Sequence, residues 1–189
     1  MKDLSLNIMD IIENSVSAKA TEIKIMIEVM LMRNKLHINI QDNGIGMDEE
    51  LVEMVQNPFY TSKTHRTKKI GLGIPFFKQN VELCNGTFSL HSQRGKGTKI
   101  DVVMDYDHID RMPLGNLADT FCSVIIGHPE IDFELELKRI YLSREKVFHF
   151  STIEMRETLG EIPFTYPDVI RYIQNTIKNG IKKIELEER

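Results

Sequence analysis

The chain has 189 residues, which is long enough for one large or two small domains with a proper hydrophobic core. Hydrophobic residues make up 41% of it and charged residues 28%, as is ordinary for a soluble globular protein. With a formal net charge of -4, no apolar run of membrane-spanning length and no signal peptide, we expect a cytoplasmic protein without a nucleic-acid or membrane partner.

Apolar residues recur at helical spacing near the start of the chain. They predict an amphipathic helix over about residues 3–18, with Asp3 as its N-cap. On this helix Asp10 and Asn14 are separated by four positions, so they share one face, one turn apart. A carboxylate and a carboxamide stacked in this way could hold a divalent cation and orient a water molecule. A solvated helix face is the alternative.

Two strands are predicted next, because apolar residues alternate over 21–30 and over 35–41. The second leads into Asp42-Asn-Gly44-Ile-Gly46-Met. Gly44 and Gly46 allow positive φ and let the backbone approach a ligand closely. Ionised Asp42 is only an acceptor, so it could hold an exocyclic amine such as that of adenine. A plain strand-to-helix turn is the alternative, because Asn-Gly is common in turns.

A short helix over 49–55 is followed by an irregular cationic segment, residues 57–70, which suits either a mobile lid over a polyanion or a solvated loop. Gly71-Leu72-Gly73 then opens an apolar-periodic helix. Backbone N–H groups at such a helix start can bind an anion, although ordinary loop-to-helix junctions have the same pattern. Two more strands, 87–92 and 98–105, are joined by a basic hairpin turn.

This order of elements predicts an α+β fold, an α/β sandwich in which a mixed sheet carries helices on one face. We divide the chain into residues 1–106, a linker at 107–115, and a smaller α+β region at 116–189. In the last region we expect helices over 114–126, 151–159 and 167–179, with a strand pair between the first two. Thr165 is the expected N-cap of the final helix, and Gly180 its terminator. Ser151-Thr-Ile-Glu154 resembles a capping box that opens the helix over 151–159, and a longer strand is the alternative. This region would receive a signal, bind a partner or simply cover the sheet.

Taken together, short segments within residues 3–105 resemble the boxes of the Bergerat-fold ATPases. This superfamily includes histidine kinases, DNA gyrase, mismatch-repair ATPases, Hsp90 chaperones, and mitochondrial-type and anti-sigma serine kinases. The resemblance is closest to the histidine-kinase-like ATPase domains. In chain order the segments are Asp10–Ala20 (N box), Asp42–Gly46 (G1 box), Pro58–Lys63 (F-box region), Gly71–Ile74 (G2 box) and Gly95–Thr98 (last box).

The resemblance implies that ATP and Mg²⁺ are the cofactors. On the purine side, Asp42 would bind the adenine amino group, and Thr98 would help through a water molecule. Gly44 and Gly46 would shape the adenine pocket.

On the phosphate side, Asn14 would give its side-chain oxygen to Mg²⁺, and Asp10 is the candidate catalytic residue. Lys63 would neutralise phosphate charge from the lid. Backbone N–H groups would be presented to the phosphates by Gly71, Leu72 and Gly73. Such an arrangement suits phosphoryl transfer, in which positioning and charge neutralisation supply most of the catalysis.

The sequence departs from the family pattern at two positions. Gyrase-like, mismatch-repair and anti-sigma members carry Glu where this chain has Asp10, so the carboxylate reaches one methylene less far. Histidine kinases often carry a basic residue where this chain has Ser17. We also expect the chain to lack its own phosphoacceptor domain.

The function implied is an ATPase or protein kinase that acts on a protein partner or substrate. The alternative is a non-catalytic nucleotide sensor, which would regulate a partner through the C-terminal region. An interaction module that binds no nucleotide is the third hypothesis.

Overall fold

A computed structural model describes residues 2–57, 72–160 and 162–185 of the chain. The helices are α1 (Leu4–Ser17), α2 (Glu49–Val55), α3 (Gly73–Leu83), α4 (Leu117–Gly127), α5 (Thr152–Leu159) and α6 (Pro167–Lys183), with a short 3-10 helix η1 (Leu31–Arg33). The strands are β1 (Glu22–Met30), β2 (Lys35–Asp42), β3 (Thr87–Gln93), β4 (Gly97–Asp105), β5 (Asp132–Tyr141) and β6 (Arg144–Ser151).

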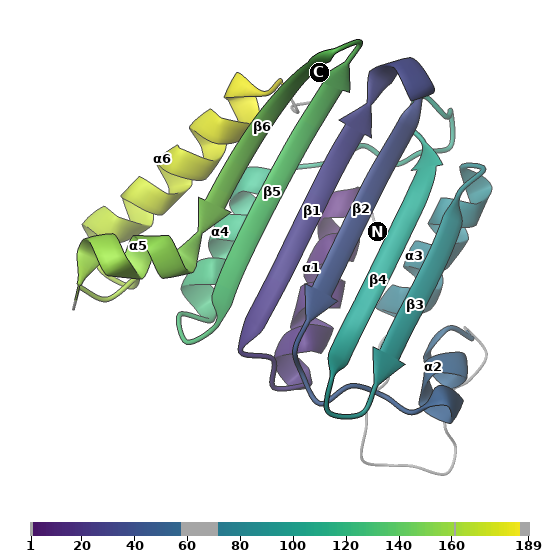
Figure 1. Ribbon diagram of the computed structural model, residues 1–189, viewed down its shortest axis with the longest axis horizontal. Helices are drawn as coiled ribbons and strands as arrows, with labels where there is room; N and C mark the ends of the chain where they lie inside the picture. The colour runs from purple at the N-terminus through teal and green to yellow at the C-terminus, as the bar shows by residue number, and fades with distance from the viewer. Residues whose placement is uncertain (1, 58–71, 161, 186–189) are drawn as a thin grey trace.

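The strands form one six-stranded sheet in the order β3-β4-β2-β1-β5-β6. Neighbouring strands are antiparallel, except that β5 runs parallel to β1. Helices α1, α3, α4 and α6 lie on one face of this sheet (Figure 1). The fold is therefore the predicted α+β sandwich with a mixed sheet and helices on one face.

The C-terminal region extends the sheet that the N-terminal half begins. β5 pairs along the whole of β1, from Glu22 with Asp132 to Met30 with Ile140. The predicted linker, residues 107–115, passes between β4 and α4. The division of the chain into separate domains stays a prediction, but both halves contribute to one hydrophobic core.

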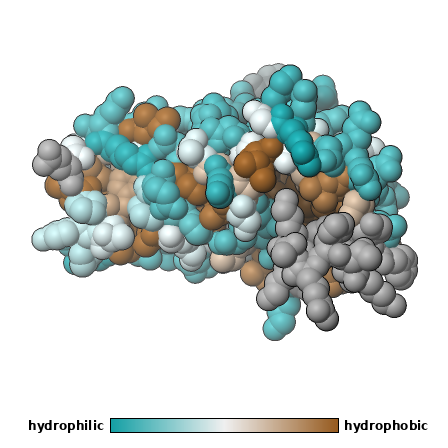
Figure 2. Space-filling view, turned by 90° about the horizontal axis from the view of Figure 1, so that it is seen from below, coloured by the Kyte–Doolittle hydropathy of each residue, from teal (hydrophilic) through white to brown (hydrophobic). Residues whose placement is uncertain are grey.

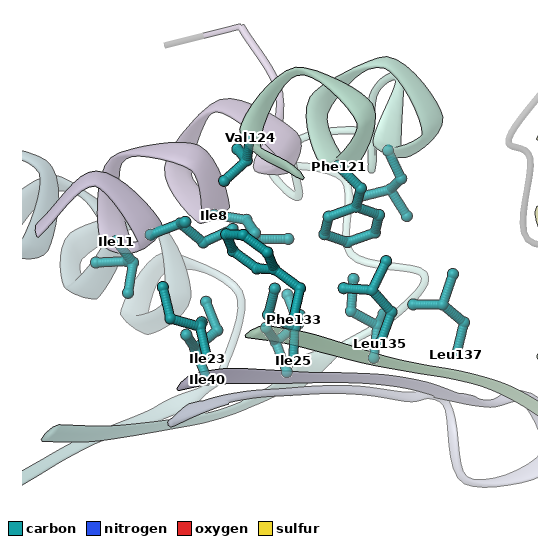
Figure 3. Close-up of a cluster of buried hydrophobic side chains, with 14 of the residues drawn as sticks. Ile8, Ile11, Ile23, Ile25, Ile40, Phe121, Val124, Phe133, Leu135 and Leu137 are labelled. Carbon is teal, nitrogen blue, oxygen red and sulfur yellow. The ribbon is translucent and has the colours of Figure 1, made fainter. Parts of the chain in front are cut away.

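This core follows from the period-two alternation of the strands, which places every second side chain on the helix side. In β1, for example, Ile23, Ile25 and Ile27 are fully or almost fully buried, whereas the intervening Lys24 is exposed. Figure 3 shows side chains of α1 and α4 meeting those of the strands, including Phe133 of β5. Burying one such side chain completely contributes about 1.5–3 kcal/mol.

Side-chain caps fix where several helices begin. Asp3 accepts from the backbone N–H of Leu6 and so caps α1, as the sequence predicted. The predicted cap of α5 is also confirmed, since Ser151 accepts from the N–H of Glu154. Asn116 caps α4, so this helix begins later than the predicted position 114.

The prediction that Gly180 ends α6 is wrong, because the helix continues through Lys183. A Cβ on Gly180 would lie 2.2 Å from Cε2 of Phe148 on β6. The glycine therefore allows the helix to pack closely on the sheet. The predicted cap Thr165 is also wrong, since the N-cap position is Tyr166 and no side chain caps it. No helix in the described part of the chain is long and apolar enough to cross a membrane.

Candidate functional site

A cavity of about 430 Å³ opens beside α1 at the edge of the sheet where β2 ends and β4 begins. Its lining is mostly apolar and consists of Ile11, Ala18, Ile45, Met47, Leu51, Val55, Ile74 and Ile100, with Asn14, Ser15, Ser17, Asp42, Gly46 and Thr98. Figure 2 looks at this edge of the molecule, where apolar side chains lie exposed among polar ones. A largely apolar pocket with a few polar groups is typical of small-molecule sites.

Asp42 is a buried carboxylate in the wall of this cavity, with 6% of its surface exposed. Ser15 Oγ donates to Oδ2 at 2.7 Å, and the backbone N–H groups of Gly44 and Thr98 donate to Oδ1 at 2.9 and 3.2 Å. These donors offset the cost of burying the charge. An ionised carboxylate has about four acceptor positions, so this one still has capacity for a donor from a ligand.

Glycines hold the backbone around Asp42 in place. Gly97 has φ +84°, and a Cβ there would lie 1.9 Å from the carbonyl oxygen of Asp42. Gly46 has φ +64°, and its Cβ would lie 2.0 Å from the carbonyl oxygen of Gln93. Both positions combine a left-handed conformation with a close approach of another backbone segment, which only glycine tolerates. The turn after β2 is thereby packed against the β3–β4 hairpin.

Asn14 lines the cavity from the last turn of α1, and its side chain is exposed. Asp10, one turn earlier, is half-buried and lies against the first residue of α3, since a Cβ on Gly73 would lie 2.9 Å from Asp10 Oδ2. Burial raises the pKa of the Asp10 carboxyl, and the nearby charge of Glu13 also acts to raise it. The Asp10 carboxylate therefore adjoins the N-terminus of α3.

Leu72 occupies the N-cap position of α3, and its side chain makes no capping hydrogen bond. The first N–H groups of a helix have no partner within the helix, so they are available to an anion. Asn57, the first residue of the predicted lid, is described. The rest of the lid, residues 58–70 with Lys63, lies outside the described residues, and so does Gly71. The roles assigned to Gly71 and Lys63 stay predictions.

Two serines hold the site together, although neither was among the predicted binding residues. Ser15 supports Asp42, and its place on the buried, otherwise apolar face of the first helix was the signal available in the sequence. Ser92 Oγ accepts from Met47 N at 2.8 Å and donates to Gly97 O at 2.8 Å. It joins the turn after β2 to the hairpin, a link that depends on tertiary pairing and leaves no local sequence signal.

A family model described as "Histidine kinase-, DNA gyrase B-, and HSP90-like ATPase" matches residues 2–108. The chain belongs to this family. The matched segment contains α1 through β4 and every residue that lines the cavity. Membership of this ATPase family implies that the nucleotide bound is ATP.

Proteins that are similar in sequence to this chain include sensor histidine kinases. It is 35% identical over 89 residues to the sensor histidine kinase YvrG of Bacillus subtilis, covering 46% of this chain and 15% of YvrG. It is 32% identical over 102 residues to sporulation kinase B of the same organism, covering 53% of this chain and 23% of the kinase. The chain thus spans a quarter or less of the length of these relatives.

A solved structure extends the similarity of fold to almost the whole chain. The crystal structure of the N-terminal domain of a DNA repair protein aligns with a TM-score of 0.51 at 16% identity. The alignment covers 96% of this chain and 59% of that one. At this identity the match shows the fold alone, and its coverage includes the region of β5 and β6.

Proposed function

We propose that this chain binds ATP with Mg²⁺ in the cavity beside α1 and transfers or hydrolyses the terminal phosphoryl group. The observation that carries the proposal is the gathering of Asp42, Thr98 and Asn14 on one cavity in a member of an ATPase family. The cavity lies within the common size range of small-molecule pockets.

The purine end of the ligand would lie in the apolar part of the cavity. Asp42 is fixed by its donors before any ligand arrives, so its carboxylate needs no reorganisation to accept an N–H from the adenine amino group. β2 and β4 pair with Asp42 opposite Thr98, which places the threonine next to the same group. Guanine carries a carbonyl oxygen in place of that amine and would meet the carboxylate with a repulsive acceptor.

The phosphate end would lie toward Asn14 and the start of α3. Mg²⁺ prefers oxygen ligands, and the exposed carboxamide of Asn14 can supply one beside the phosphates. Bound Mg²⁺ would neutralise phosphate charge, and the N–H groups at the start of α3, with Lys63 and Gly71, would add to this. Asp10 would accept a proton from the attacking nucleophile.

The histidine-kinase relatives suggest that the phosphoryl acceptor is a protein. We propose that this acceptor is a protein other than the chain itself. We also propose a cytoplasmic location. The non-catalytic sensor remains the second candidate, because Asp10 is shorter than the glutamate of related ATPases. In that case nucleotide binding would change what the C-terminal region contacts.

Nucleotide binding is tested by thermal-shift titration with ATP, ADP and GTP, with and without Mg²⁺. A ligand at 100-fold excess over Kd stabilises the folded protein by about 2.7 kcal/mol. Adenine nucleotides should stabilise the protein, and GTP should not. Asp42→Asn should weaken ADP binding about 10- to 100-fold, because a hydrogen bond to a charged group contributes about 1.5–3 kcal/mol.

Asp101→Asn is the matched control, because Asp101 is another β-strand carboxylate but points away from the cavity and bonds to His37 and Asn39. Its ADP affinity should equal that of the wild type. Equal stabilisation of Asp42→Asn and wild type by ADP would refute the assignment of the purine site.

Turnover is tested by phosphate release and by labelling of candidate partners with radioactive γ-phosphate. Asp10→Asn should lower the rate more than it lowers ADP affinity, since Asp10 is assigned to the chemical step and not to purine binding. ATP binding without any turnover, with candidate partners present, would favour the sensor.

A further inference from the structure

Asn7 is buried in α1 without a hydrogen-bond partner. Its side chain is fully buried, and neither Nδ2 nor Oδ1 has a partner, which in the described part of the chain is true of no other buried side chain. Two other buried polar side chains are paired, Ser15 with Asp42 and Thr152 with the N–H of Phe133. An unpaired buried amide lowers stability, so its presence in a folded protein calls for an explanation.

The position of Asn7 on α1 connects it with the proposed catalytic residues. It lies one turn before Asp10 and two turns before Asn14, on the side of the helix that meets α3 at Gly73. Residues three apart on a helix are surface neighbours, with Cβ atoms about 5–6 Å apart. The structure has no hydrogen bond between the Asn7 amide and the Asp10 carboxylate. At this spacing a change of side-chain rotamer or one water molecule would connect the two groups.

We propose that Asn7 is a positioning residue for Asp10. With nucleotide bound, its Nδ2 donates a hydrogen bond to the Asp10 carboxylate, either directly or through one ordered water. This inference rests on the proposed function and deepens it, because it names a second residue of the same phosphoryl-transfer site.

Such a donor has an electrostatic consequence. A hydrogen bond to the ionised form of a carboxyl favours that form, which a general base needs. Burial, which has the largest effect on the pKa of Asp10, and the charge of Glu13 both favour the protonated form. Asn7 opposes these two effects and fixes the direction of the carboxylate.

The variant Asn7→Leu separates positioning from packing. It removes the unpaired polar atoms but keeps a branched side chain, so the thermal midpoint should rise by a few degrees, about 2–8 °C. We expect kcat for phosphate release to fall about 10-fold or more, while the Kd for ADP stays within about twofold, since general-base catalysis contributes about 10²–10⁴-fold. The pKa of Asp10, followed by carboxyl NMR in the ADP-loaded protein, should rise by about one pH unit.

Two further variants keep the test decisive. Asn7→Ala covers the case in which leucine does not fit, and should show the same fall in kcat and rise in the Asp10 pKa. Thr152→Val is the matched control, since it removes a buried polar group that has a partner, far along the chain in α5. It should lower the thermal midpoint and leave kcat and the Asp10 pKa unchanged.

The outcomes distinguish this inference from the function on which it rests. Asn7→Leu and Asn7→Ala with wild-type kcat and a wild-type Asp10 pKa overturn the inference alone. If the wild-type protein binds ADP without turnover, the pKa of Asp10 measured by NMR in the Asn7 variants still tests the inference. A wild-type protein that binds no adenine nucleotide overturns the proposed function and the positioning role together.

Discussion

The two parts of the sheet that flank β1 obey the same packing rule but differ in what their glycines do. On both sides, alternate apolar side chains face a layer of helices. In the β2–β4–β3 part, Gly46 and Gly97 let backbone segments meet around Asp42. In the β5–β6 part, Gly180 lets a helix approach the ring of Phe148. At Gly46 and Gly97, beside the cavity, the close contact is with backbone, whereas at Gly180 it is with a side chain.

The largest effect that this comparison predicts is that of Gly97→Ala. The added Cβ would meet the backbone of Asp42 and would occupy a left-handed conformation. Strain and overpacking together should lower the free energy of unfolding by about 3–5 kcal/mol. ADP affinity should also fall, because Asp42 must move. Denaturant unfolding and ADP titration measure the two effects.

Gly95→Ala provides the control in the same hairpin. Gly95 also has positive φ, but nothing lies within 4 Å of its Cβ position. The loss should be only about 1–2 kcal/mol, from the left-handed conformation. Equal stability of the two variants would mean that the contact with Asp42 does not constrain the site.

Gly180→Ala should have a smaller effect, confined to stability. The clash is with a side chain that can shift, so about 1–3 kcal/mol should be lost to overpacking, partly offset by the better helix propensity of alanine. ADP affinity should not change. Combining Gly180→Ala with Phe148→Leu should cost less than the sum of the single changes, because the two residues share one contact. A drop in ADP affinity would contradict the division between the two parts of the sheet.

The smallest effect concerns Asp101, on the sheet face opposite the helices. Burial alone would raise the pKa of its carboxyl, but hydrogen bonds from His37 and Asn39 outweigh burial and hold the pKa below its ordinary value. A lowered pKa stabilises the folded state above the unfolded value of about 3.9, and this stability is lost as pH falls through the lower folded value.

The Asp101 side chain is 35% exposed, so its contribution should stay below about 1 kcal/mol. The difference between the unfolding free energies at pH 7 and near pH 3 should therefore be slightly smaller in Asp101→Asn than in the wild type. An unchanged or steeper acid dependence would show that the His37 and Asn39 bonds do not stabilise the carboxylate.

Local sequence signals predicted the elements that are defined locally. Alternating apolar residues predicted β1 and β2, and the N-caps Asp3 and Ser151 predicted where two helices begin. Each of these patterns lies within a few consecutive residues. The resemblance to the Bergerat-fold ATPases implied that Asn14, Asp42 and Thr98 belong to one site, and all three line the cavity. Their roles in binding remain predictions.

The features that escaped prediction depend on distant partners. Gly180 has the local pattern of a helix terminator, but Phe148 decides its role. Ser92 matters because the hairpin meets the turn after β2. Nothing local in Asn7 distinguishes it from a solvated polar residue, and only its complete burial does so.

The parallel pairing of β1 with β5 also sets the shortest fragment worth studying. The segment that matches the ATPase family ends at residue 108, before β5 begins. A protein truncated there would keep every cavity-lining residue, yet β1 would become an edge strand with unpaired N–H and C=O groups. Such a fragment would tend to self-associate, so its nucleotide affinity would have to be measured against its state of aggregation. In this chain the segment that the family model matches is shorter than the segment that keeps β1 paired on both sides.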